Sequence, residues 1–107
     1  MVRQISACAL SQALVAGQAV RLIDVRQPWE SQLASLSGSL QIPLNELPQR
    51  SQEIGADHAV LVVYCHHGIR SQSAAAYLDR LGFQNVQSLI GGIDAWSCEI
   101  DPAVPRY

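Results

Sequence analysis

The sequence contains no lysine, so all seven of its basic residues are arginines. Charged residues make up only 15% of the 107 residues, and the net charge at pH 7 is −2. Proteins that bind nucleic acid non-specifically are basic, so nucleic acid is not an expected partner. Any positive charge at a binding site must come from an arginine or a protonated histidine.

Cysteine is also scarce. The three cysteines are Cys8, Cys65 and Cys98, and no two of them form a Cys-x-x-Cys pair. An odd and sparse set of cysteines is typical of a protein in a reducing compartment, and it argues against a disulfide scaffold. We therefore expect a cytoplasmic protein.

No apolar run approaches the roughly 20 residues that a membrane-spanning helix needs. The apolar N-terminal stretch, residues 1–18, is interrupted by polar residues, and no small-residue cleavage site of a signal peptide follows it. Leu10, Ala13, Leu14 and Gly17 recur at helical spacing, which predicts an amphipathic helix. No association with a membrane is expected.

Almost half of the residues (49%) are hydrophobic, and the length suits one domain over residues 1–107. Short apolar runs predict strands at 21–25, 39–42, 60–64 and 85–89, with a weaker one near Gln4 and Ile5. Helices are expected at 7–16, 28–34, 45–53, 71–81 and 93–98. The run 60–64 lacks polar alternation, as does a strand buried on both faces of a parallel sheet. The alternation of strands and helices along the chain predicts an α/β fold, an open parallel sheet with helices on both faces.

Cys65 directly follows the buried strand 60–64 and precedes the clearest helix, which Ser71 is expected to cap. Gly82 and Phe83 are placed to end that helix in a Schellman motif. Ligands of open α/β sheets bind at the carboxyl ends of the strands. Unpaired N–H groups at the start of a helix favour an anion, so we expect Cys65 to react as a thiolate.

The residues after Cys65 form a short loop whose amides can surround an anion. The candidate substrate-binding residues of this loop are His66, His67, Gly68, Ile69, Arg70 and Ser71. Gly68 allows a tight turn because glycine adopts positive φ. Cysteine-dependent phosphatases have one more residue between their cysteine and arginine, and its absence shortens the chain by up to about 3.5 Å. The shorter loop favours a single sulfur atom over a tetrahedral phosphoryl group.

Several segments of the chain occur in the order and at the spacing typical of single-domain rhodaneses: LIDVRQPWE, IPLNELP, VVYCHHGIRS, YLDRLGFQNV, GGIDAW and DPAVPRY. From about residue 21 onwards the chain resembles this family of thiosulfate sulfurtransferases. The resemblance implies a five-stranded parallel sheet, Cys65 as the catalytic nucleophile that carries a persulfide, and no cofactor. It also implies thiosulfate as the sulfur donor and cyanide or a thiol, including a protein thiol, as the acceptor.

The chain departs from the family pattern at two places. Ser35 and Ser37 replace the usual His and Pro before the third strand. His66 stands where the family often has a basic residue after the cysteine. Because imidazole titrates near pH 6.5, the attraction of a dianionic donor is expected to depend on pH.

Further residues are expected to support the loop: Asp24, Arg26, Glu30, Gly91 and Gly92. Arg70 has two open roles. It could bind the anionic end of the substrate, or it could brace the loop by pairing with Asp24 or Glu30. Bracing is favoured, because backbone amides already supply the cradle.

No metal is expected, because the adjacent residues Cys65, His66 and His67 cannot readily converge on one tetrahedral ion. Cys8 and Cys98 are expected to be inert. Two other functions stay open. The domain could be a non-enzymatic sulfur-relay or docking module that loads from another protein, or, less favoured, a cysteine-dependent phosphatase.

Overall fold

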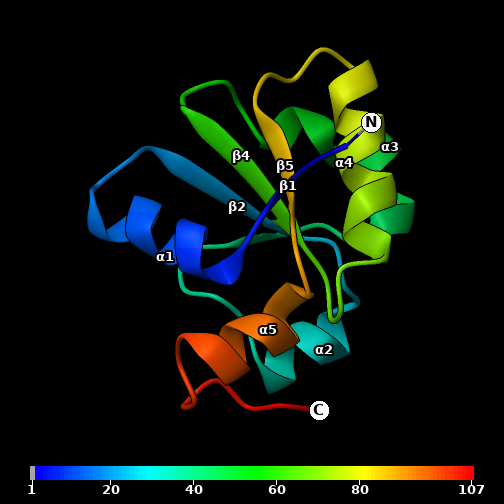
Figure 1. The fold of residues 1–107 in the computed structure, drawn as a ribbon. Coiled ribbons are helices and arrows are strands. Elements are labelled where there is room, and N and C mark those ends of the chain that lie inside the picture. The colour runs from blue at the N-terminus through cyan, green and yellow to red at the C-terminus, as the bar shows by residue number, and fades with distance from the viewer. Residues whose placement is uncertain (1) are drawn as a thin grey trace.

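The strands form one parallel sheet. The protein's structure is a computed structural model that describes residues 2–107. The strands are β1 (Arg3–Ile5), β2 (Val20–Asp24), β3 (Leu40–Gln41), β4 (Val60–Tyr64) and β5 (Val86–Leu89). They pair in parallel in the order β1-β5-β4-β2-β3 (Figure 1). The strand that leads to Cys65 is therefore the central one.

The helices cover both faces of this sheet. They are α1 (Ala7–Val15), α2 (Pro28–Leu33), α3 (Leu47–Arg50), α4 (Arg70–Arg80) and α5 (Gly92–Glu99), with the short 3-10 turns η1 (Leu44–Glu46) and η2 (Ser51–Glu53) on either side of α3. In Figure 1, α3 and α4 lie on one side of the sheet and α1 on the other, and α5 packs against α1. The predicted fold class, an open five-stranded parallel sheet flanked by helices on both faces, is confirmed.

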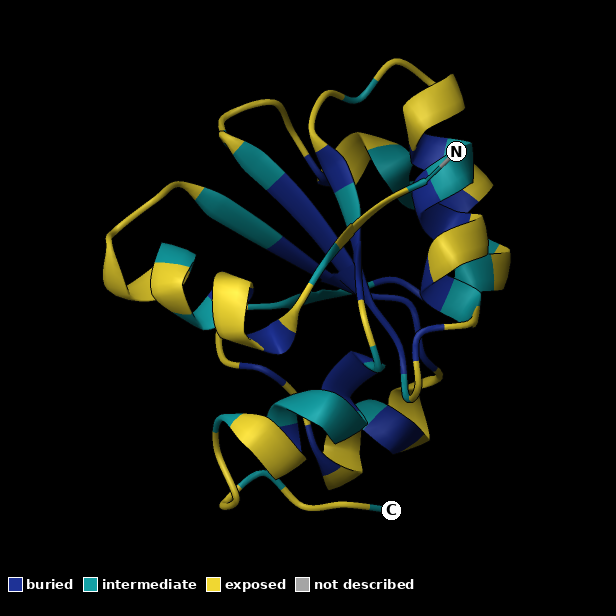
Figure 2. Cartoon of the chain, in the orientation of Figure 1, coloured by how far each residue is buried: buried dark blue, intermediate teal, exposed yellow. Residues whose placement is uncertain are grey.

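The side chains of β4 alternate between two hydrophobic clusters. Leu61 and Val63 pack with side chains of α3 and α4, and Val62 and Tyr64 pack with side chains of α1 and α5. Figure 2 shows the centre of the sheet as buried. Each fully buried aliphatic side chain contributes about 1.5–3 kcal/mol, so packing on both faces fixes this strand firmly. Cys65 continues the alternation toward the cluster of α4.

The predicted helix 45–53 is not continuous. Residues in this region form η1, α3 and η2 in succession. Pro48 explains the break between η1 and α3, because proline has no N–H to donate to the carbonyl of residue 44. The prediction of helical structure was right, but the prediction of one unbroken helix was wrong.

The ends of α4 were predicted with mixed success. The helix begins at Arg70, and its N-cap residue Ile69 provides no side-chain cap, so the prediction that Ser71 caps it was wrong. At the other end, the N–H of Phe83 donates to Leu78 O at 3.2 Å, and Gly82 has a φ of +103°. This is the predicted Schellman ending.

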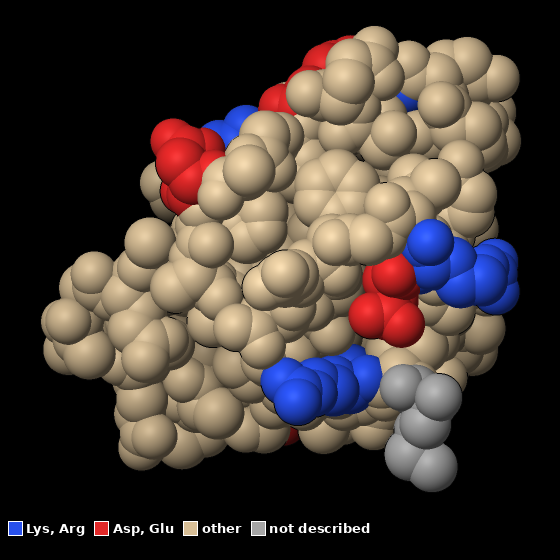
Figure 3. Space-filling view, turned by 90° about the horizontal axis from the view of Figure 1, so that it is seen from above, with Lys and Arg blue, Asp and Glu red and all other residues tan. Residues whose placement is uncertain are grey.

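Charged side chains are spread thinly over the surface. On the face shown in Figure 3, arginine and acidic residues form small separate patches, and other residues cover most of the surface. Within residues 2–107, no helix is long and apolar enough to cross a membrane. The expectation that nucleic acid does not bind stays a prediction.

Candidate active site

Cys65 lies at the carboxyl end of β4, where only 1% of its surface is exposed. Its Sγ accepts hydrogen bonds from the backbone N–H groups of Gly68 at 3.1 Å and Ser71 at 3.3 Å. The hydroxyl Oγ of Ser71 lies 3.5 Å from the same sulfur. We call residues 65–71 the thiol loop. Its polar groups converge on Sγ, where they can stabilise a negative charge.

The start of α5 holds the first carbonyls of the thiol loop. The N–H of Ile93 donates to Cys65 O at 2.9 Å, and the N–H of Asp94 donates to His66 O at 3.1 Å. Both N–H groups belong to the first turn of α5, where no intrahelical acceptor is available to them. Because the loop's carbonyls face α5, its own N–H groups are free to face the sulfur.

Glycine is required where α5 meets the thiol loop. Gly92 has a φ of +61°, and a side-chain carbon there would collide with the carbonyl oxygens of Cys65 and His66. Gly68 has a φ of +101°, and a side-chain carbon there would lie 3.1 Å from the backbone nitrogen of Gly91. Gly91 itself has a φ of +73° as the N-cap of α5. These glycines let two backbone segments approach closely.

Arg70 pairs with Glu30. Its Nη1 and Nη2 atoms each donate to one carboxylate oxygen of Glu30 at 2.8 Å. These hydrogen bonds are the main cause that lowers the pKa of Glu30 to about 2, against the opposing effect of burial. Asp24 is not the partner of Arg70. Of the two roles left open by the sequence, this geometry supports bracing.

Asp24 and Arg26 form a fully buried pair at the end of β2. Arg26 Nε donates to Asp24 Oδ1 at 2.8 Å, and its Nη2 donates to Oδ2 at 2.7 Å. Burial lowers the pKa of Arg26, but hydrogen bonds to Asp24 and Tyr107 more than offset burial and raise it. The guanidinium also donates to the carbonyl of Ala34. The pair thereby joins β2 to the end of α2.

Tyr107 is a residue of the site that the sequence analysis missed. Its ring stacks on His66 with a centroid distance of 3.9 Å and an angle of 7°. Its hydroxyl donates to Glu30 Oε1 at 2.9 Å and accepts from Arg26 Nη1 at 2.8 Å. No local pattern reveals these contacts, because 81 residues separate Arg26 from Tyr107. The tail DPAVPRY, one of the family-like segments, was the available signal.

The two histidines of the thiol loop differ. Burial, followed by the charge of His67, lowers the pKa of His66. The expectation that the attraction of a dianionic donor depends on pH stays a prediction. His67 is exposed, and its Nε2 lies 4.0 Å from Asp94 Oδ2.

His66, His67 and Asp94 offer metal-ligand atoms that lie within 4.8 Å of one another. The sequence argument considered only Cys65, His66 and His67, and the structure adds the carboxylate of Asp94 beside the two histidines. Its carboxylate already pairs with Arg106 at 2.9 Å, which competes with a cation. That the protein holds no metal stays a prediction.

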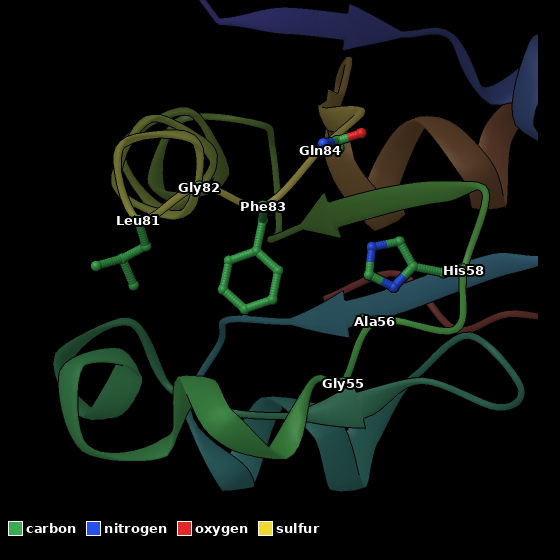
Figure 4. Close-up of a pocket in the computed structure, with 7 residues that line it drawn as sticks. All are labelled: Gly55, Ala56, His58, Leu81, Gly82, Phe83 and Gln84. Atoms are coloured by element: carbon green, nitrogen blue, oxygen red, sulfur yellow. The ribbon is translucent and has the colours of Figure 1, made fainter.

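A cavity of about 410 Å³ lies away from the thiol loop (Figure 4). It is lined by Gly55, Ala56, His58, Leu81, Gly82, Phe83 and Gln84. These residues precede β4 or follow α4. Cys65 instead lies between the end of β4 and the start of α4. The cavity is therefore not part of the candidate active site.

Comparisons with known proteins identify the family of the chain. A family model described as "Rhodanese-like domain" matches residues 6–99. The Sulfurtransferase of Allochromatium vinosum is 41% identical over 97 residues, which cover 91% of this chain and 90% of that protein. Thiosulfate sulfurtransferase GlpE of Vibrio cholerae is 37% identical over 86 residues, 80% of each chain. The crystal structure of a rhodanese-related protein from Thermoplasma volcanium has a TM-score of 0.81 at 33% identity and covers 96% of this chain and 95% of its own. The chain belongs to the rhodanese-like domain family.

Proposed function

We propose that the protein is a sulfurtransferase that moves sulfane sulfur from thiosulfate, or a related donor, to cyanide or a thiol through a persulfide on Cys65. The observation that carries the proposal is the convergence of hydrogen-bond donors from Gly68 and Ser71 on the buried Sγ. Two relatives bear the names Sulfurtransferase and Thiosulfate sulfurtransferase, which supports the same reaction.

The reaction proceeds in two displacements at sulfur. The thiolate of Cys65 attacks the outer sulfur of thiosulfate, a new S–S bond forms, and sulfite leaves with the electron pair of the broken S–S bond. Cyanide or a thiolate then attacks the outer sulfur of the persulfide, and the Cys65 thiolate is regenerated. Electrons balance within each exchange, so the cycle needs no cofactor. Ping-pong kinetics follow, because sulfite leaves before the acceptor reacts.

The surrounding residues bind and support. The N–H groups of the thiol loop hold the donor and the persulfide, and residues 66–71 form the rim of the substrate site. Arg70 is occupied by Glu30, so it braces the loop. Asp24 and Arg26 anchor the end of β2, and Gly91 and Gly92 let α5 reach the loop.

Intact mass spectrometry tests the proposal. After brief exposure to thiosulfate and desalting, the protein should gain the mass of one sulfur atom, and cyanide should remove it as thiocyanate. Steady-state assays should show parallel lines in double-reciprocal plots. A protein that gains no sulfur and instead hydrolyses an aryl phosphate would be a phosphatase, contrary to the proposal.

A second candidate function is a relay that receives sulfur from a protein persulfide. It is favoured by the apolar side chains near the thiol loop, since Ile69 is 79% exposed and Trp29 is 59% exposed. The rings of Trp29 and Tyr107 form a T-shaped pair with a centroid distance of 6.1 Å, and Tyr107 stacks on His66. A relay would load rapidly from a protein persulfide and turn over thiosulfate very slowly. We place either reaction in the cytoplasm, where the exposed thiols of Cys8 and Cys98 stay reduced.

A further inference from the structure

Two buried serines lie in a row beside the sulfur of Cys65. Ser71 Oγ is 3.5 Å from Cys65 Sγ and 2.7 Å from Ser88 Oγ. Ser71 is 0% exposed and Ser88 is 1% exposed. Ser88 belongs to β5, where it pairs with Val63 of β4. The sheet, and not the thiol loop, therefore fixes the position of the second hydroxyl.

The number of protons limits how these groups can bond. A hydroxyl carries one proton, and a thiolate can only accept. When Cys65 is a thiolate, Ser71 can use its single proton to donate to Sγ. The hydrogen bond between the two serines must then use the proton of Ser88, with Ser71 Oγ as the acceptor. Each hydrogen bond in such a chain polarises the next one, which strengthens the bond to the sulfur.

The preferred direction changes when the sulfur is loaded. In a persulfide, Sγ bridges two atoms and the negative charge resides on the outer sulfur. Sγ then attracts the Ser71 proton less, and Ser71 can donate to Ser88 instead. The two hydroxyl protons can reorient when the negative charge moves to the outer sulfur, without any movement of the backbone.

We propose that Ser88 is a positioning residue for sulfur transfer, which directs the hydroxyl proton of Ser71 toward Sγ while Cys65 is a thiolate. The inference rests on the proposed function, because it takes Cys65 as the nucleophile. Ser88 acts through Ser71 and does not itself contact Sγ. Its loss leaves the N–H donors of Gly68 and Ser71 in place, so activity should fall without being abolished.

A double-mutant cycle with Ser71→Ala and Ser88→Ala tests the inference. All variants carry Cys8→Ser and Cys98→Ser, so that iodoacetamide labels Cys65 alone. Ser88→Ala should move the midpoint of the pH profile of alkylation to higher pH and slow thiosulfate:cyanide turnover, because Ser71 loses the polarisation by Ser88. The effect should be smaller than that of Ser71→Ala, which removes one hydrogen bond to a charged group and should slow turnover about tenfold. In the Ser71→Ala background, Ser88→Ala should have no further effect.

Ser39→Ala is the matched control. It also removes a serine hydroxyl that contacts another hydroxyl, that of Tyr64 at 2.8 Å, but it should leave the alkylation profile unchanged. A folded Ser88→Ala variant with the parental profile, or effects of the two serine substitutions that add independently, would overturn the inference. Because alkylation needs no sulfur donor, this outcome is distinguishable from a failure of sulfur transfer itself.

Discussion

At the scale of single residues, the surroundings of the sulfur separate Cys65 from the other cysteines. Its Sγ is buried and accepts two backbone hydrogen bonds. Cys8 in α1 and Cys98 in α5 are exposed, and Cys98 lies near the end of its helix, where the helix dipole disfavours a thiolate. The elements on which the three cysteines lie were predicted from the sequence. The direction in which the N–H groups of the thiol loop point could not be predicted, because it depends on the contact with α5.

The sulfur should therefore reside on Cys65 alone. In the double variant with Cys8→Ser and Cys98→Ser, thiosulfate should still add one cyanide-removable sulfur, and the protein should keep its thiosulfate:cyanide activity. Cys65→Ser should do neither, because a serine hydroxyl is not ionised near neutral pH and cannot form a persulfide. Intact mass and circular dichroism of each variant provide the check. A labile sulfur on folded Cys65→Ser protein would disprove the assignment.

The pair of Glu30 and Arg70 should make stability depend on acid. The pKa of Glu30 is lowered from 4.5 to about 2 in the folded protein, so the carboxylate's contribution is fully present above pH 4.5 and is lost as the pH falls toward 2. At pH 7, Glu30→Gln should lower the free energy of unfolding by about 3 kcal/mol. Urea titrations at pH 7 and pH 3 should show a smaller difference between the two proteins at pH 3.

The matched control for this charge pair is Glu53→Gln. Glu53 pairs with Arg50 at the surface, where solvent screens the charges, so the substitution should change stability little. If Glu30→Gln were equally mild at pH 7, the bracing role of Arg70 would be wrong.

At the scale of elements, the pattern of apolar residues predicted the fold well. The central strand was predicted at residues 60–64 and is observed there, because burial on both faces leaves an unbroken apolar run. The prediction failed where contacts between residues far apart in the sequence determine the role of a side chain. Ser71 was predicted to be a local cap, yet its hydroxyl forms a hydrogen bond with that of Ser88 in β5. No local pattern predicts the contacts of Tyr107, because its partners lie just after β2, in α2 and in the thiol loop.

The junction of α5 and the thiol loop should be sensitive to one added carbon. In Gly92→Ala, the methyl group would push against the carbonyls of Cys65 and His66, displace the loop and slow sulfur transfer by more than about tenfold. Gly17→Ala is the control, because Gly17 also has a positive φ, +78°, but open space around it. It should cost about 1 kcal/mol of stability and leave the specific activity unchanged. Equal activities of the two folded variants would contradict the requirement for glycine at residue 92.

At the scale of the whole molecule, contacts between distant segments join the end of the chain to its first half. Tyr107 bonds to Arg26 and Glu30, and Ser97 Oγ donates to Val104 O at 2.6 Å, which holds the tail against α5. Figure 1 shows this tail running below α5. The expectation that residues 1–107 form one domain stays a prediction of the sequence, and such contacts are what a single cooperative unfolding transition would require.

Tyr107→Phe should separate the two roles of the tail. It removes the hydroxyl that serves Arg26 and Glu30 but keeps a ring that can stack on His66, so stability should fall by about 1–3 kcal/mol. Tyr107→Ala should in addition slow sulfur transfer, because His66 and the thiol loop lose their cover. Urea unfolding and thiosulfate:cyanide assays give the two readouts. Tyr77→Phe, at a half-buried tyrosine of α4, is the control, and a loss of stability as large as that of Tyr107→Phe would refute the assigned hydroxyl contacts.

The burial of Cys65 also affects how easily oxidants can reach this cysteine. An S–S bond is about 2 Å long, so the outer sulfur of the proposed persulfide extends beyond Cys65. An acceptor molecule then contacts the outer sulfur before it contacts Cys65. With 1% of its surface exposed, the empty cysteine offers little to bulky oxidants that would convert it irreversibly to sulfinic or sulfonic acid. In the proposed reaction, the burial of Cys65 therefore also shields its thiolate from such oxidants between turnovers.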